Sequence, residues 1–107
     1  ILTGIEKMDI QNLRDSDELK EILSTYKGEL KLICGHIHRN IVTQFGNVIC
    51  QIAPGVSHAV TIDLREGSPN CLTKEPGSFL LHEMRDGILT HQIPVNDYDG
   101  PYLFYPE

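Results

Sequence analysis

The clearest hydrophobic pattern in the chain lies in residues 16–27, where four large side chains recur at the spacing of one helix face. They stand at positions i, i+3, i+4 and i+7: Leu19, Ile22, Leu23 and Tyr26. Asp15 and Glu18 have capping-box spacing ahead of this stripe, and Gly28 follows it as a typical helix stop. The pattern therefore predicts a helix over 16–27 that buries one face.

Short β-like runs dominate the rest of the chain. The apolar run at 30–34 is typical of a strand buried on both faces. Two further pairs of runs flank turn dipeptides and predict hairpins: 41–45 with 48–52 around Gly-Asn, and 78–85 with 88–95 around Asp-Gly. Residues 59–64 predict one more strand. One main helix followed by mostly antiparallel strands and hairpins indicates an α+β fold.

Composition narrows the class of protein. A chain of 107 residues is one domain or part of a larger one, and its net charge of −6 argues against a nucleic-acid polymer as partner. Neither a membrane-length apolar run nor a signal-peptide pattern is present, so no membrane partner is expected. Three cysteines without C-x-x-C spacing predict a reducing, cytoplasmic location and a role as small apolar residues. Because the chain opens at Ile1 without methionine, we expect a piece of a longer protein.

Candidate chemistry lies directly after the run at 30–34. Gly35 follows it, where we expect a sharp turn that a side chain would obstruct, and then come His36 and His38. In extended backbone, side chains at i and i+2 point the same way, so both imidazoles can face one site. Neutral imidazole binds zinc, iron, manganese or cobalt. By itself, however, such a pair occurs by chance and supplies two ligands where a metal needs four or more.

The order of several motifs resembles one family. The run LICGHIHR at 32–39 is followed by a hairpin, then by APGVSH at 53–58 and EPGSFLLH at 75–82, and the chain ends with GPYL at 100–103. Together they are similar to the C-terminal part of calcineurin-like metallophosphoesterases. The branch that they resemble most contains the bacterial class III cyclic-nucleotide phosphodiesterases and glycerophosphodiesterases.

The resemblance implies a four-layer α/β/β/α sandwich with two divalent metal ions (iron, manganese, zinc or cobalt) in the full-length enzyme. It also implies hydrolysis of a small phosphodiester through a bridging hydroxide. His36 would bind the second metal and His38 the first, whereas the upstream ligand motifs of the family are missing from residues 1–107. This range is therefore expected to be the C-terminal fragment of the domain, with little activity alone. His58 is either a contact to the substrate phosphate or to a ligand, or a hydrogen-bonded loop histidine.

Other interpretations stay open. The segment could be a non-catalytic oligomerisation or cap segment, in which the aromatic tail at 96–107 lies across a surface or makes a homo-oligomer contact. A cupin barrel also uses His-x-His, but no acidic residue follows the pair at 39–46, so we set it aside. We expect Arg39 to face solvent, and His82 and His91 to be structural or exposed.

Overall fold

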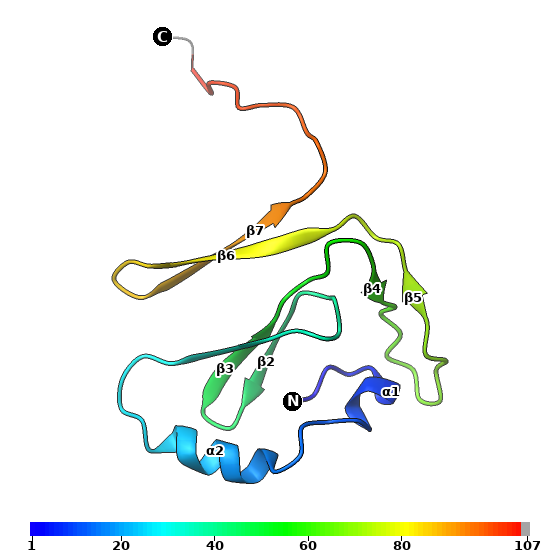
Figure 1. Cartoon of the computed structure of the whole chain (residues 1–107), viewed down its shortest axis with the longest axis vertical. Helices are drawn as coiled ribbons and strands as arrows, with labels where there is room; N and C mark the ends of the chain where they lie inside the picture. Colours follow the sequence, from blue (N-terminus) through cyan, green and yellow to red (C-terminus); the bar gives the residue numbers. More distant parts are fainter. Residues whose placement is uncertain (106–107) are drawn as a thin grey trace.

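The computed structural model describes residues 1–105, which form two short helices and seven strands (Figure 1). The elements are α1 Glu6–Asp9, α2 Ser16–Ser24, β1 Lys31–Cys34, β2 Ile41–Phe45, β3 Val48–Ile52, β4 Ala59–Val60, β5 Leu72–Thr73, β6 Ser78–Met84 and β7 Ile88–Pro94. All strand pairs except one are antiparallel. The expected α+β class is confirmed for this part of the chain.

The central element is a three-stranded sheet in the order β1-β3-β2, in which β1 runs parallel to β3. The hairpin β2–β3 is confirmed, with Phe45 opposite Val48 across a two-residue turn. Gly46 in this turn has a φ of +62°, a conformation that glycine adopts without steric cost. The predicted hairpin register is therefore fixed by its turn.

The two faces of this sheet differ in burial. Phe45, Cys50 and Ile52 are almost completely buried on one face, where the ammonium group of Lys20 in α2 lies 5.3 Å from the centre of the Phe45 ring. On the other face Ile33 remains 44% exposed. The prediction that the strand at 30–34 is buried on both faces is therefore wrong for the described residues, because the helices cover one face of the sheet.

Helix α2 begins at Ser16, as predicted, but its capping and its C-terminal end differ from the prediction. Asp15 at its N-cap has a φ of 56° and makes no side-chain capping bond, so the capping box is wrong. The helix ends at Ser24, well before Gly28, and the hydroxyls of Ser24 and Thr25 donate to carbonyls of the last turn at 2.6 and 2.7 Å. These bonds satisfy carbonyl groups that a longer helix would use. Ile22 is 64% exposed, so the predicted stripe is not a buried face.

The second predicted hairpin forms as β6–β7, with Met84 opposite Ile88. Its loop has three residues, not two, and Asp86 and Gly87 both have positive φ. Side chains join this hairpin to the central sheet, because the Lys31 ammonium donates to Gln51 Oε1 at 2.6 Å and to Thr90 Oγ1 at 2.7 Å. The hairpin therefore lies alongside the sheet and is held there by polar contacts (Figure 1).

The strand predicted over 59–64 is much shorter in the structure. Only Ala59 and Val60 pair, with Thr73 and Leu72 of β5, a strand that the sequence pattern did not indicate. Beyond them Asp63 turns back to accept hydrogen bonds from Arg65, and these bonds lower the pKa of Asp63 to about 2. This local turn competes with further strand pairing.

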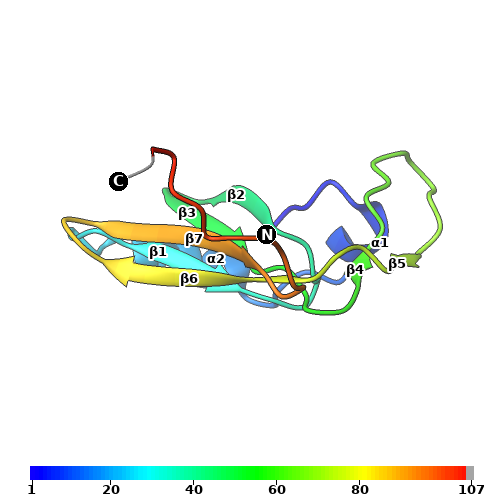
Figure 2. The ribbon, with the colours of Figure 1, turned by 90° about the horizontal axis from the view of Figure 1, so that it is seen from above.

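The buried apolar cluster is small and joins the N-terminal segment to the sheet through Ile5, Ile37 and Ile52. The described chain is flat, measuring 55 × 40 × 18 Å, as Figure 2 shows from above. These residues do not by themselves form four layers, so the four-layer sandwich stays a prediction. Among the described helices, none is long and apolar enough to cross a membrane.

The tail that follows β7 has no regular structure and leads away from the rest of the chain (Figure 1). Tyr102 and Phe104 are 79% and 98% exposed. The tail therefore does not lie across the surface of its own chain. Residues 106–107 of the predicted tail lie outside the described residues, and its contact with a second subunit stays a prediction.

Candidate metal centre

The two histidines of the His-x-His motif lie in a tight loop after β1. His36 and His38 have φ angles of 84° and 59°, in the left-handed region, so the extended backbone assumed from the sequence is wrong. Ile37 between them is 7% exposed and belongs to the apolar cluster. This buried side chain anchors the loop and leaves the His36 side chain exposed and His38 half-buried.

Backbone hydrogen bonds attach this loop to the segment after β3. The carbonyl of Cys34 accepts from the amide of Ala53 at 2.8 Å, and that of His38 accepts from the amide of Gly55 at 3.0 Å. The carbonyl of Ile37 accepts from the amide of Val60 at 3.1 Å. The histidine loop is therefore held along its length, in spite of its irregular backbone.

The glycine that the site requires is Gly55, not Gly35. A Cβ atom on Gly55 would lie 2.5 Å from the His58 carbonyl oxygen and 2.7 Å from His38 Cβ. A Cβ atom on Gly35 would meet nothing within 4 Å, so the expected obstruction at Gly35 is wrong. The missing side chain at 55 lets this segment pass close to the His58 backbone and the His38 side chain.

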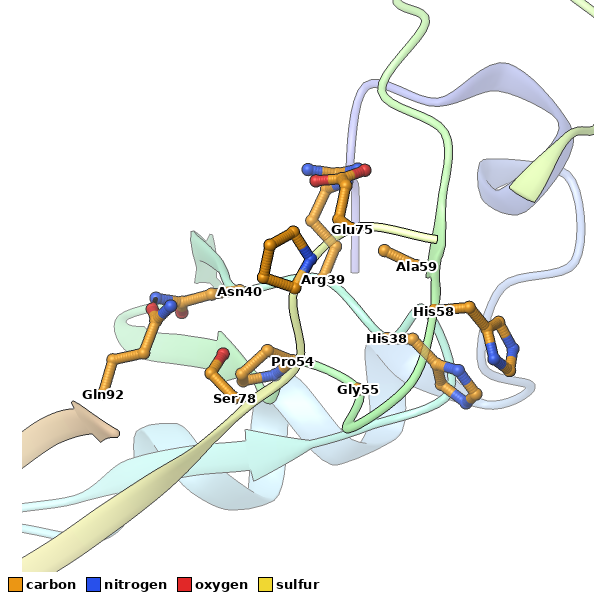
Figure 3. A pocket seen from close by; sticks show the side chains of 11 residues that line it. His38, Arg39, Asn40, Pro54, Gly55, His58, Ala59, Glu75, Ser78 and Gln92 are labelled. Atoms are coloured by element: carbon orange, nitrogen blue, oxygen red, sulfur yellow. Dashed lines mark hydrogen bonds and ion pairs between the residues drawn. The ribbon is translucent and has the colours of Figure 1, made fainter. Parts of the chain in front are cut away.

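Three histidines line one cavity of about 240 Å³. Its lining residues are Met8, His36, His38, His58, Val60, Asn70, Cys71 and Leu72. The rings of His38 and His58 are tilted by 57° with their centres 4.5 Å apart, and Figure 3 shows both rings on the same side of the segment at Gly55. The structure thus brings His36, His38 and His58 to a common cavity.

Within residues 1–105, no group of three or more histidine, cysteine, aspartate or glutamate side chains is placed to hold a metal ion. Two imidazoles at a cavity fit part of the ligand set of a zinc or iron site, whereas such sites need four or more ligands. The donor chemistry of His36 and His38 therefore suits a metal that further groups would complete. Metal ligation by these two residues stays a prediction.

His58 is also held by a hydroxyl group. Ser57 Oγ lies 2.9 Å from His58 Nδ1, which fixes one ring nitrogen and leaves the other, Nε2, for a second partner. This contact is compatible with both interpretations of His58 from the sequence. His82 likewise bonds Thr90 Oγ1 at 2.9 Å, and His91 is exposed, as expected for structural or exposed histidines.

Arg39 does not face solvent as expected. Its side chain is 16% exposed, donates to the Val60 carbonyl at 2.9 Å and pairs with Glu75. Hydrogen bonds from Thr73 and then from Arg39 lower the pKa of Glu75. Figure 3 shows this pair across the Pro54–Gly55 segment from the histidine rings. Arg39 and Glu75 line a polar cavity of about 150 Å³ together with His38 and His58. Arg39 therefore fixes the loop instead of meeting solvent.

The cysteines have surroundings that the sequence did not indicate. Cys71 lies on β5's lead-in segment and lines the histidine cavity, although no spacing motif marks it. The sulfur atoms of Cys34 and Cys50 lie 3.8 Å apart on neighbouring strands. Burial, and then the adjacent Cys34 thiol, raise the pKa of Cys50 to about 11. A half-buried Cys34 and a buried Cys50 agree with the expected apolar role.

Comparison with known proteins gives one informative likeness. No family model matches the chain. A protein of Arcobacter nitrofigilis named probable glycerophosphodiester phosphodiesterase GpdQ is 39% identical over 107 residues, a match that covers 97% of this chain and 39% of that protein. The chain thus spans well under half of the length of the relative that it resembles.

Proposed function

We propose that this chain is part of a metallophosphoesterase that hydrolyses small phosphodiesters, of the glycerophosphodiester or cyclic-nucleotide class. The observation that carries the proposal is the common cavity of His36, His38 and His58. The likeness to a protein named as a glycerophosphodiester phosphodiesterase supports the same reaction class. Hydrolysis would yield a phosphomonoester and an alcohol.

His36 and His38 would hold the metal in the full-length protein. When bound, divalent iron, manganese, zinc or cobalt supplies Lewis-acid activation of water and neutralises phosphate charge. The buried Ile37 and the bond from the Gly55 amide to the His38 carbonyl hold the backbone that carries the two imidazoles. His58 would contact the substrate phosphate, with its ring oriented by Ser57.

The chain by itself would be nearly inactive. Two imidazoles cannot hold two metal ions, and within the described residues no group of three or more ligand side chains is placed to hold one. The remaining ligands would come from the portion that the relative has and this chain lacks. The full-length protein is therefore the material for every activity test.

The test is hydrolysis of bis(p-nitrophenyl) phosphate by the full-length protein loaded with divalent metal. We expect His36→Ala and His38→Ala each to lower kcat/KM about 100-fold or more, because each removes a metal ligand. His91→Ala is the matched control, since His91 is an exposed histidine on β7, and should retain the wild-type rate. A loss below about tenfold in either ligand variant would contradict the proposal.

A second candidate function is subunit assembly, and the hairpin β6–β7 favours it. Thr90 faces the central sheet, so alternation along the strands places the opposite face outward. That outer face carries apolar side chains of both strands, among them Phe79, Leu81 and Leu89, which are 44%, 52% and 42% exposed. An exposed apolar face continued by an aromatic tail is typical of a protein interface, so we propose a homo-oligomer contact there.

A further inference from the structure

The strand pair β1–β3 places two thiols side by side. Cys34 pairs in register with Ile52, and Cys50 with Leu32, so the cysteines are diagonal neighbours on the same face of the sheet. Their sulfur atoms lie 3.8 Å apart, in direct contact. A disulfide has its sulfur atoms about 2.05 Å apart, so the two sulfurs must approach each other by less than about 2 Å.

The two thiols differ in access. Cys50 is completely buried, whereas Cys34 is half-buried and lines an apolar cavity of about 300 Å³ next to His36. A reagent can therefore reach Cys34 first, and Cys50 reacts from inside the sheet. Within the described residues β1 pairs with β3 alone.

We propose that Cys34 and Cys50 form a reversible intramolecular disulfide by exchange with a low-molecular-weight disulfide such as oxidised glutathione. Cys34 Sγ loses its proton to solvent and attacks one sulfur of the small disulfide, releasing one thiol. Cys50 Sγ, whose ionisation is disfavoured by burial, then loses its proton in the slow step and attacks Cys34 Sγ in the mixed disulfide, releasing the second thiol. Two protein thiols are oxidised, and the small disulfide is reduced to two thiols.

The bond would act on the histidine loop. Cys34 is the last residue of β1, its carbonyl holds the Ala53 amide, and His36 follows two residues later. Diagonal neighbours on adjacent strands have Cα atoms about 7–8 Å apart, at or beyond the usual disulfide range, so closure of the bond displaces this strand end, which carries the loop. Intracellular disulfides are usually transient and redox-sensing, so the bond does not conflict with a reducing compartment. The disulfide would thereby be coupled to phosphodiester hydrolysis. This coupling rests on the proposed function, whereas the disulfide itself does not.

The bond is tested in the full-length protein carrying Cys71→Ser, which removes the exposed third thiol of this chain. After incubation with oxidised glutathione and proteolysis without reductant, mass spectrometry should find the Cys34 peptide joined to the Cys50 peptide, lighter by two hydrogen atoms. Alkylation of Cys34 by iodoacetamide should slow at least about tenfold and recover with dithiothreitol. The matched control Cys34→Ser should give no such joined peptide.

Three outcomes would overturn the bond: Cys34 present only as its mixed disulfide with glutathione, Cys34 joined to another cysteine, or Cys34 unmodified. The alkylation readout uses no substitution at either cysteine of the pair, so a misfolded variant does not decide the result. Coupling predicts that oxidation slows diester hydrolysis about tenfold or more, reversibly. An unchanged rate in oxidised protein overturns the coupling, and an inactive reduced wild-type protein overturns the proposed function, while the peptide result stands in both cases.

Discussion

At the scale of single residues, Gly55 constrains the candidate site more tightly than Gly35, the residue directly before the histidine pair. The segment around Gly55 passes within contact distance of His38 and His58, where any side chain would displace one of them. Such a requirement depends on two segments that meet only in the folded chain. For this reason the sequence pointed to Gly35, which stands beside the histidines, and not to Gly55.

Replacement of this glycine gives the first prediction. In the full-length protein, Gly55→Ala should lose about 1–3 kcal/mol of the free energy of unfolding, because its Cβ overpacks against the His58 carbonyl and His38. Chemical denaturation measures the loss. Gly35→Ala is the matched control and should change stability by less than about 0.5 kcal/mol, since open space surrounds its Cβ. Equal losses in the two variants would refute this account of the loop.

The Cys50 thiol gives a pH prediction. Burial raises the pKa of Cys50 from an ordinary value of 9.0 to about 11 in the folded chain. Between these values the unfolded chain loses the proton that the folded chain keeps, so the free energy of unfolding falls as pH rises from 9.0 to about 11. The contribution of the protonated Cys50 thiol to the free energy of unfolding is fully present below pH 9.0.

Denaturation curves across that pH range measure the effect in the full-length protein. Cys50→Ala should be less stable at every pH, because it leaves a cavity, but should show a smaller decline toward high pH. The difference between the two declines isolates Cys50 from other groups that titrate there. Parallel declines would show that the Cys50 thiol is not protected from ionisation by folding.

At the scale of elements, polar side chains attach the hairpin β6–β7 to the central sheet. Gln51 lies at the centre of this contact, 7% exposed, with Lys31 and Asn40 on either side. Asn40 in turn donates to Gln92 of β7 at 2.6 Å. A buried amide needs all of its partners, so the hairpin position depends on the complete network.

Lys31→Met should therefore cost about 1–3 kcal/mol of the free energy of unfolding, because Gln51 Oε1 and Thr90 Oγ1 lose their donor. Hydrogen exchange of the β7 amides should quicken in the same variant of the full-length protein. Lys74→Met replaces an exposed lysine and should leave both quantities at the wild-type level. Equal hydrogen-exchange rates of the β7 amides in Lys31→Met and Lys74→Met would show that the network has no role in docking the hairpin.

Local sequence signals predicted the two hairpins, because their turn residues lie directly between the paired strands. Both hairpins formed, because Gly-Asn and Asp-Gly specify a reversal within a few residues. The strand expected over 59–64 shortened because Asp63 bonds Arg65, and β5 has no periodic pattern at all. Helix α2 begins at the predicted Ser16 but ends earlier than predicted, because hydroxyl bonds at Ser24 and Thr25 satisfy its last carbonyls.

The sequence identified the histidines of the candidate site but not the geometry in which they meet. The motifs named His36, His38 and His58, and the structure places all three at one cavity. The left-handed backbone at the first two, however, follows from the burial of Ile37 in a cluster with Ile5 and Ile52. That cluster joins distant parts of the chain, so no local pattern could indicate it.

At the scale of the whole molecule, the described chain is thin and leaves much apolar surface uncovered. The outer face of β6–β7 and the tail both expose large apolar side chains near the C-terminus. If they join subunits, Leu81→Glu should shift the full-length protein to later elution in gel filtration, because a charge would be buried in the contact. Deletion of residues 96–107 should act in the same direction.

Met84→Glu is the control for this prediction. Met84 is 76% exposed on the same strand, but alternation places it on the opposite face from Leu81. This variant should elute with the wild type. Identical elution of all the variants would rule out the hairpin and tail as a subunit contact.

The most direct test of the account is where metal binds in the full-length protein. Crystals grown with zinc and measured by anomalous diffraction should contain two metal peaks about 3.5–4 Å apart. One nitrogen of His36 and one of His38 should each lie about 2.0–2.1 Å from a peak. Anomalous peaks elsewhere, or either imidazole turned away from both metals, would contradict the assignment of this loop as a metal-binding element.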